Sequence, residues 1–394
     1  MHKEMRSVIL DDFLKKKLSS YGASMGMFLF YSLIAILLGK RHDYSAYSDQ
    51  WSLIFSGADP WVNHGVWTGN AYGIFFNFFA FFHALHPLFP KVLFILSWML
   101  SGFWVLSQFQ WSSREKKELF LLFFLNPLFL IEFLSYGLND SVVASLVLFA
   151  VVLSERSKGI YAGILLGLGV LFKFVPLVLF PLFWVLPGQS IRSWNHKFFA
   201  SFFSVVLMGL ILSYGLWGDS FLFPFTFASH RPPKDLSIFR FLISEMSLWA
   251  GVFSETRIAV LSKTLIFLSS LMVFLSYFRK KISFIQAVAA EFLVTLMFYQ
   301  VGHLQFQTSL LFLLPLLVMD FKNRGVWNLS KKRVMIVYVS FLMLFQVFVT
   351  IMGQYHPLVE WVRSWISIPY FLLAMGLLRV ILSHQIWSVN PERE

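Results

Sequence analysis

Residues 137–176 read GLNDSVVASLVLFAVVLSERSKGIYAGILLGLGVLFKFVP, and this stretch decides the fold. Two apolar runs, 141–154 and 159–172, are separated only by a short turn that carries Arg156 and Lys158. Apolar runs of this kind, repeated along a chain, are typical of helices that cross the hydrocarbon of a bilayer. We therefore predict two neighbouring membrane helices, with Asp140 entering the first and Lys173 ending the second.

The composition extends this prediction to the whole chain. Of the 394 residues, 58% are hydrophobic and only 13% are charged, which leaves too little polar surface for a protein that is soluble in water. This excludes a soluble enzyme, a nucleic-acid-binding domain and a disordered chain. The prediction is an all-α, polytopic membrane protein that forms a single integral membrane domain over residues 1–394.

Hydropathy predicts twelve membrane helices. They cover 21–39, 91–111, 118–135, 141–154, 159–172, 174–187, 198–217, 257–278, 283–300, 304–319, 334–352 and 366–383. The segments 159–172 and 174–187 are short and meet at Lys173, so they are expected to be two half-helices. Segment 71–86 is expected to lie in the outer interface or to re-enter it.

The basic residues predict the orientation. Most of the 32 Lys and Arg fall in segments that are cytoplasmic if the N-terminus is cytoplasmic, so the positive-inside rule places both termini there. The net charge of +12 then reflects topology, and no nucleic-acid partner is needed. The large external segments are 40–90, with interfacial helices, and 218–256. The expected location is a bacterial plasma membrane, with the endoplasmic reticulum membrane as the alternative.

Motifs for nucleotides and metals are absent from the sequence. It contains no GxxxxGK[ST], no GxGxxG after a strand and no HExxH, and it has no Cys. The spacing of the His residues suggests no metal site. We therefore expect neither a metal nor a cofactor.

The first candidate catalytic residue is Asp49, which follows the first predicted span. A carboxylate among aromatic neighbours such as Tyr47 and Trp51 would be partly desolvated, and it could accept the proton of a hydroxyl group as a general base. The alternative is a solvated loop acid or a helix cap.

A second group surrounds the quoted stretch. Asn139 and Asp140 lie at an external turn, where Asp140 could also cap the following helix. Lys173 is a cation at a helix break, and we expect it to meet a lipid phosphate. The alternatives for Lys173 are snorkelling or an ion pair with the membrane acid Glu132. The glycines at 163, 167 and 169 are expected to let helices pack closely.

Two further groups lie later in the chain. Arg231, Lys234 and Arg240 suit an anionic head group, with a solvated basic loop as the equal alternative. His303 begins an external turn, where a structural role is at least as expected as a catalytic or pyrophosphate-binding one.

These motifs together resemble the GT-C superfold of integral membrane glycosyltransferases. An acid after the first span, Gly137-Leu138-Asn139-Asp140 after Asn126-Pro127, and a Gly-rich span ending in Lys173-Phe174-Val175-Pro176 occur in the same order. The closest similarity is to bacterial polyprenyl-phosphate-mannose-dependent α-mannosyltransferases, with a fainter likeness to the catalytic subunit of GPI mannosyltransferase I. The resemblance covers 43–187, and a two-acid motif in the first loop is missing.

The resemblance implies a hexosyltransferase of the membrane. It would move a sugar, mannose, from a polyprenyl-phosphate donor to a hydroxyl of a lipid or glycan acceptor by an inverting displacement. Asp49 matches the family's essential external acid, and Asn139, Asp140, Lys173 and His303 match positions near the donor. The alternatives from the residues are a transporter or flippase of lipid-linked sugars, and a lipid-linked oligosaccharide polymerase or ligase.

Overall fold

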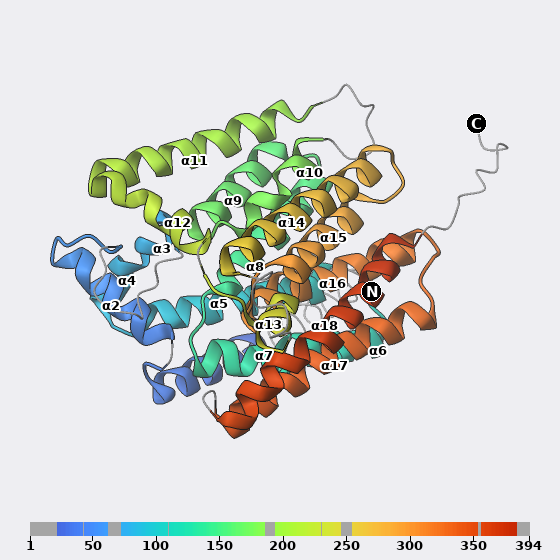
Figure 1. Ribbon diagram of the computed structural model, residues 1–394, viewed down its shortest axis with the longest axis horizontal. Helices are drawn as coiled ribbons and strands as arrows, with labels where there is room; N and C mark the ends of the chain where they lie inside the picture. Colours follow the sequence, from blue (N-terminus) through green and yellow to red (C-terminus); the bar gives the residue numbers. More distant parts are fainter. Residues whose placement is uncertain are drawn as a thin grey trace, which may run out of the picture.

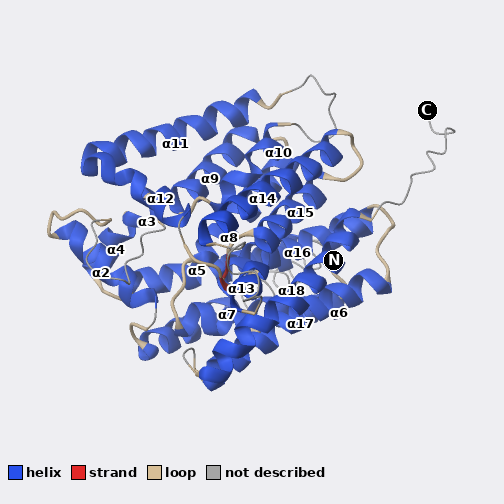
Figure 2. Ribbon diagram, in the orientation of Figure 1, coloured by secondary structure: helices blue, strands red, loops and turns tan. Residues whose placement is uncertain are grey.

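The protein was analysed as a computed structural model, which describes residues 22–41, 43–61, 72–108, 110–185, 194–229, 231–245, 254–353 and 356–383. Nearly all of this part of the chain is helical, and a pair of two-residue strands is the only sheet among the described residues (Figure 2). The prediction of an all-α membrane protein is confirmed.

The first half of the chain runs from the N-terminal helix to the helix break at Lys173. It contains a helix over Gly22–Leu38, α2 (Asp43–Phe55), α3 (Ile74–Asn77), α4 (Phe79–Leu85), α5 (Phe89–Gln108), α6 (Ser113–Phe124), α7 (Pro127–Phe129), the π-helix η1 (Leu130–Ser135), α8 (Asp140–Glu155) and α9 (Gly159–Phe172).

The second half contains the remaining helices of the bundle and the two strands. It contains η2 (Val175–Leu179), α10 (Phe180–Trp184), α11 (His196–Trp217), η3 (Gly218–Leu222), α12 (Phe223–Ser229), β1 (Lys234–Asp235), α13 (Ile238–Ser244), α14 (Glu255–Phe278), α15 (Phe284–Phe298), β2 (Val301–Gly302), η5 (Leu304–Phe306), α16 (Gln307–Asn323), α17 (Leu329–Met352) and α18 (Pro357–Leu382).

The number of spans differs from the prediction. Among the described residues, seven helices are long and apolar enough to cross a membrane, or eight if Gly22–Leu38 and α2, which meet at 83°, form one broken span. Each of the twelve predicted ranges does contain a helix, but several of them, including α9 and α15, are too short to count by length. Hydropathy detects these helices because most of their residues are buried among other helices, where apolar side chains are also favoured.

The glycines of the quoted stretch bring α9 against α11 (Figure 1). A Cβ atom added at Gly163 would lie 2.1 Å from Ser201 Oγ, and one at Gly167 would lie 3.1 Å from a Val205 methyl group. The two helices can therefore approach only because side chains are missing at these positions. The predicted packing role is confirmed for Gly163 and Gly167, whereas Gly169 has only ordinary contacts.

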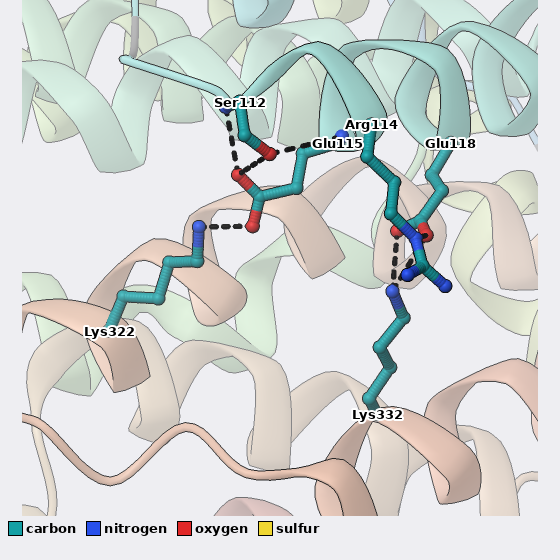
Figure 3. Close-up of polar contacts among 6 residues, drawn as sticks. All are labelled: Ser112, Arg114, Glu115, Glu118, Lys322 and Lys332. Carbon is teal, nitrogen blue, oxygen red and sulfur yellow. Dashed lines mark hydrogen bonds and ion pairs between the residues drawn. The ribbon is translucent and has the colours of Figure 1, made fainter.

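One end of the bundle is held by basic residues, and we call it the basic end. Ser112 and Glu115 form a capping box at the start of α6, and Glu115 also pairs with Lys322 of α16 (Figure 3). Lys332 of α17 donates to Glu118 at 2.7 Å (Figure 3). Two segments predicted to share one side of the membrane, 112–117 and 320–333, therefore lie together.

The short helices α2, α3 and α4 lie together at one side of the bundle (Figure 1). Their aromatic side chains form a cluster of their own with Phe172 at the end of α9. The backbone N–H of Gly73 donates to the Phe172 carbonyl at 3.1 Å, and a Cβ at Gly73 would meet the Leu171 carbonyl oxygen at 2.4 Å. This contact docks the first loop onto the helix end that carries Lys173.

Candidate functional site

The centre of the site is an ion pair between the ends of two antiparallel helices. Asp140 is the first residue of α8, and Lys173 follows the last residue of α9 in an extended conformation. Lys173 Nζ lies 2.7 Å from Asp140 Oδ1, and both side chains are less than a tenth exposed. The predicted break at Lys173 is confirmed. The alternative pairing with Glu132 is wrong, because the α8–α9 turn brings Asp140 to Lys173 instead.

Aromatic rings from two distant segments cover the Lys173 ammonium group. Its nitrogen lies 5.5 Å from the centre of the Tyr72 ring and 4.4 Å from that of Phe306. Such contacts stabilise a cation that has been removed from water. They also join the first loop and η5 to the ion pair, so Lys173 is a buried residue of the site and does not snorkel to a membrane surface.

Several buried polar atoms beside this pair lack a partner within the described part of the chain. They are Asp140 Oδ2, Glu132 Oε2 and both amide atoms of Asn139, which lies next to Tyr72 without a well-formed hydrogen bond. Unsatisfied buried polar atoms are costly, so a group of them has a physical reason to exist only if something else binds there. A ligand rich in hydroxyl groups could satisfy all of them.

A second row of charges is built by β1 and β2. The strands pair in parallel, with Asp235 opposite Gly302, and this register places Asp235 beside His303. His303 Nδ1 pairs with the Asp235 carboxylate, and His303 Nε2 lies 2.9 Å from a guanidinium nitrogen of Arg231. Burial alone would raise the pKa of Asp235, but His303, Arg363 and Arg240 lower it to about 2. Asp235 is therefore ionised near neutral pH.

The N-terminal turn of α18 anchors this row. Arg363 lies 3.3 Å from Asp235 and 2.7 Å from Glu360, and Glu360 in turn accepts from Arg240 at 2.7 Å. Arg240 is thus held by a carboxylate. The Lys234 side chain is exposed, since neighbouring residues of a strand point to opposite faces.

Gly302 is required for this strand pair, and this leads to a prediction. A Cβ atom there would lie 2.3 Å from the Ser237 nitrogen and 2.7 Å from the Leu236 carbonyl carbon, so the backbone of one strand would have to move. We expect Gly302→Ala to destabilise the protein by about 1–3 kcal/mol, because the two strands, and with them Asp235 and His303, would separate. Thermal unfolding in detergent measures the effect. Gly376→Ala is the control, because nothing lies within 4 Å of a Cβ there.

Asp49, the acid chosen from the sequence, lies on the exposed side of α2. Burial lowers the pKa of His83 on α4, Lys40 lowers it further, and the Asp49 carboxylate acts in the opposite direction. Asp49 is therefore a neighbour of His83. No described contact joins it to Asp140 or Lys173, and its role as a base stays a prediction.

Asp43, which was not among the residues predicted from the sequence, stands in the first turn of α2. Asp43, Tyr47 and Trp51 follow the i, i+4, i+8 spacing of one helix face. The hydroxyl groups of Tyr47 and Tyr72 are 2.7 Å apart. Burial raises the pKa of Tyr72, and the carboxylates of Asp140 and Asp43 raise it further. Asp43 and Asp140 thus raise the pKa of the same phenol. The helical spacing of Asp43 and Tyr47 was the signal that could have identified Asp43.

A hollow of about 250 Å³ lies deeper in the bundle, between η2–α10, α14 and α15. Its lining is mostly apolar, with Val178, Pro181 and Phe267 among the contributors, and it includes a hydrogen bond from Ser270 to Glu291. The helices α11 and α14 have the smallest buried share of the seven long spans. This side of the molecule therefore suits lipid chains, and η2 links it directly to Lys173.

The arrangement combines cations, carboxylates and unsatisfied amide groups at one end of a helix bundle with apolar sides. This is the architecture of an integral membrane glycosyltransferase. The sequence matches the model of glycosyltransferase family 87 over residues 71–301, and the chain belongs to this family. No curated protein is similar enough to count as a relative.

The match contains Asn139, Asp140, Lys173, Arg231 and Asp235, whereas Asp43, Asp49 and His303 lie outside it. The expectation of a membrane glycosyltransferase is confirmed. Within the described ranges, no group of three His, Asp or Glu side chains is placed to hold a metal ion.

Proposed function

We propose that the protein transfers a hexose, mannose, from a polyprenyl phosphate to a hydroxyl group of a lipid or glycan acceptor. The observation that carries this proposal is the Lys173–Asp140 pair, because it presents a buried cation beside unsatisfied polar atoms. A cation suits the phosphate of the donor, and the unsatisfied oxygen and amide atoms suit the hydroxyl groups of a sugar.

The reaction is a single displacement with inversion. The acceptor oxygen forms a bond to the anomeric carbon while the bond from that carbon to the phosphate oxygen breaks. The proton of the acceptor passes to a carboxylate on α2, and polyprenyl phosphate leaves with the bonding electrons. We assign the base to Asp43, with Asp49 as the alternative, since Asp43 acts on Tyr72 together with Asp140.

The phosphate gains charge as it leaves. Lys173 and Arg231 are the cations that would stabilise it, because interactions that strengthen in the transition state accelerate the reaction. Asn139 and Asp140 would bind the sugar beside them. Lys234 and Arg240 remain predictions for the donor site, and Arg240 would act through its partner Glu360.

The apolar hollow beside η2 is our candidate for the isoprenoid chain of the donor. It begins a few residues after Lys173, so a phosphate at Lys173 would place the chain next to Val178 and Pro181. The positive-inside rule supports a cytoplasmic basic end, with both termini in the cytoplasm of a bacterium. The site would then face outward. A tag inserted between α10 and α11 that is accessible from outside would contradict this orientation.

The central test uses purified protein in lipid nanodiscs with polyprenyl-phosphate mannose. We expect polyprenyl phosphate to be released only when an acceptor is added, since the displacement needs the acceptor hydroxyl. Chromatography of the lipid products measures the release. Release that does not depend on an acceptor would indicate a hydrolase. In a parallel assay with the protein in sealed lipid vesicles, movement of the intact donor across the membrane without release would indicate a flippase.

A further inference from the structure

Arg231, His303 and Asp235 form a hydrogen-bonded row beside the Lys173–Asp140 pair. The Arg231 guanidinium group lies 2.9 Å from His303 Nε2, and His303 Nδ1 pairs with the Asp235 carboxylate. Phe306 connects the row to the pair, because its ring lies 5.6 Å from the His303 ring and 4.4 Å from Lys173 Nζ.

The chemistry of arginine fixes the protons in this row. A guanidinium group can only donate hydrogen bonds, so His303 Nε2 must accept with its lone pair. Nδ1 then carries the hydrogen that is donated to Asp235. His303 is therefore neutral in this arrangement, and each of its nitrogens has a defined role.

Arg231 is held at three points. Its guanidinium group donates to His303 and lies 5.7 Å from the centre of the Phe227 ring, while its backbone carbonyl accepts from Gln300 Nε2 at 2.6 Å. One guanidinium nitrogen of Arg231 makes the hydrogen bond to His303. The fork geometry leaves other N–H groups of Arg231 for an anion.

We propose that neutral His303 is a positioning residue that holds Arg231 toward the donor phosphate, and that a second proton on His303 releases Arg231 and weakens donor binding. The inference rests on the proposed function, because it takes the anion to be the phosphate of the donor. It differs from the direct donor contact expected for His303 from the sequence. A proton on Nε2 would remove the acceptor and place a second cation beside Arg231.

We attribute the pH dependence to His303 after comparing it with the charged groups around it. They are Asp235 and Arg231 in direct contact, Arg363, Arg240 and Glu360 behind Asp235, and Asp140 and Lys173 on the side of α8 and α9. The Arg side chains do not titrate, and the hydrogen bond from His303 together with the charges of Arg363 and Arg240 lowers the pKa of Asp235. His303 is the group of a type that changes charge between pH 5 and 8. Burial also raises the pKa of Asp140, and the non-titrating variant His303→Gln separates the two contributions.

The experiment compares the full-length protein with His303→Ala, His303→Gln, Arg231→Ala and the double variant in nanodiscs. The probes are polyprenyl-phosphate mannose for kinetics and polyprenyl phosphate for binding. The Gln side chain keeps an oxygen that can accept a hydrogen bond from Arg231, and it has no group that titrates. His196→Gln, at the start of α11, is the control for replacing a His far along the chain from the site.

For the wild type, we expect KM for the donor to rise roughly tenfold from pH 7.5 to pH 5.5, with a smaller change in kcat. At every pH, His303→Ala should have a donor KM about as high as that of the wild type at pH 5.5. His303→Gln should have the donor KM of the wild type at pH 7.5 and should keep this value at pH 5.5. The double variant should be no worse than Arg231→Ala, because both changes remove one interaction. Binding of polyprenyl phosphate should follow the same pattern.

Three results would overturn the inference while leaving the proposed function intact. The first is tighter donor binding in acid, which would make His303 a direct cationic contact. The second is an acid dependence that survives in His303→Gln. The third is additivity of the effects of His303→Ala and Arg231→Ala. A wild-type protein that releases no polyprenyl phosphate under any condition would overturn both.

Discussion

Asp43→Asn is expected to lower kcat by about 100- to 10,000-fold, the range for loss of a general base. The substitution keeps the size of the side chain and removes its ability to accept the proton of the acceptor. Asp43 is exposed at the start of α2 and, like Asp140, raises the pKa of Tyr72, which is the observation behind its proposed role as base. Initial rates at saturating donor measure the effect.

Asp49→Asn is the matched comparison, since it is the same change on the same helix. Asp49 lies about 200° around the helix axis from Tyr47, and its carboxylate raises the pKa of His83 instead of that of Tyr72. We therefore expect Asp49→Asn to keep at least half of the activity. Both variants must purify and bind polyprenyl phosphate like the wild type. The reverse outcome, with Asp49→Asn inactive and Asp43→Asn active, would restore the prediction made from the sequence.

The difference between these two acids shows what the sequence alone could not provide. The sequence predicts an external polar segment over residues 40–71. Within it, Asp49 is predicted to be the catalytic base because of its aromatic neighbours in the chain. Once α2 is known to be a helix, the i, i+4 spacing selects Asp43 with Tyr47 and Trp51. The missing information was the helical phase of a short, moderately polar segment.

The Lys173–Asp140 pair was within reach of the sequence. The turn at Arg156 and Lys158 joins two runs of similar length, so Asp140 and Lys173 stand at the matching ends of a helical hairpin. Glu132 is the alternative partner that the sequence suggests, because it is an acid in a membrane segment. It belongs to the π-helix η1 before the hairpin, and its orientation could not be inferred from hydropathy.

The Arg231–His303–Asp235 row could not be predicted. His303 and Asp235 are 68 positions apart, and the strands that join them are two residues long. No periodic pattern identifies strands of this length. The charges on α18 that hold Asp235 lie further still along the chain, and only the packing of the bundle brings Arg363 to it.

Lys173→Met is the second change for which we expect a large effect. It leaves the Asp140 carboxylate buried without its cation, and breaking a buried pair in this way costs about 3–5 kcal/mol. Donor binding should weaken more than acceptor binding, because the phosphate loses its buried partner. The midpoint of thermal unfolding and the KM of each substrate measure the two effects.

The double variant Lys173→Met with Asp140→Asn separates stability from function. Both buried charges are then removed, and replacing a buried ion pair with neutral groups is often close to neutral for stability. We expect the unfolding midpoint to recover most of its loss while donor KM stays high, because the cation for the phosphate is still missing. Recovery of donor binding along with stability would mean that Lys173 only holds α8 against α9. Equal weakening of donor and acceptor in Lys173→Met would point to the same structural role.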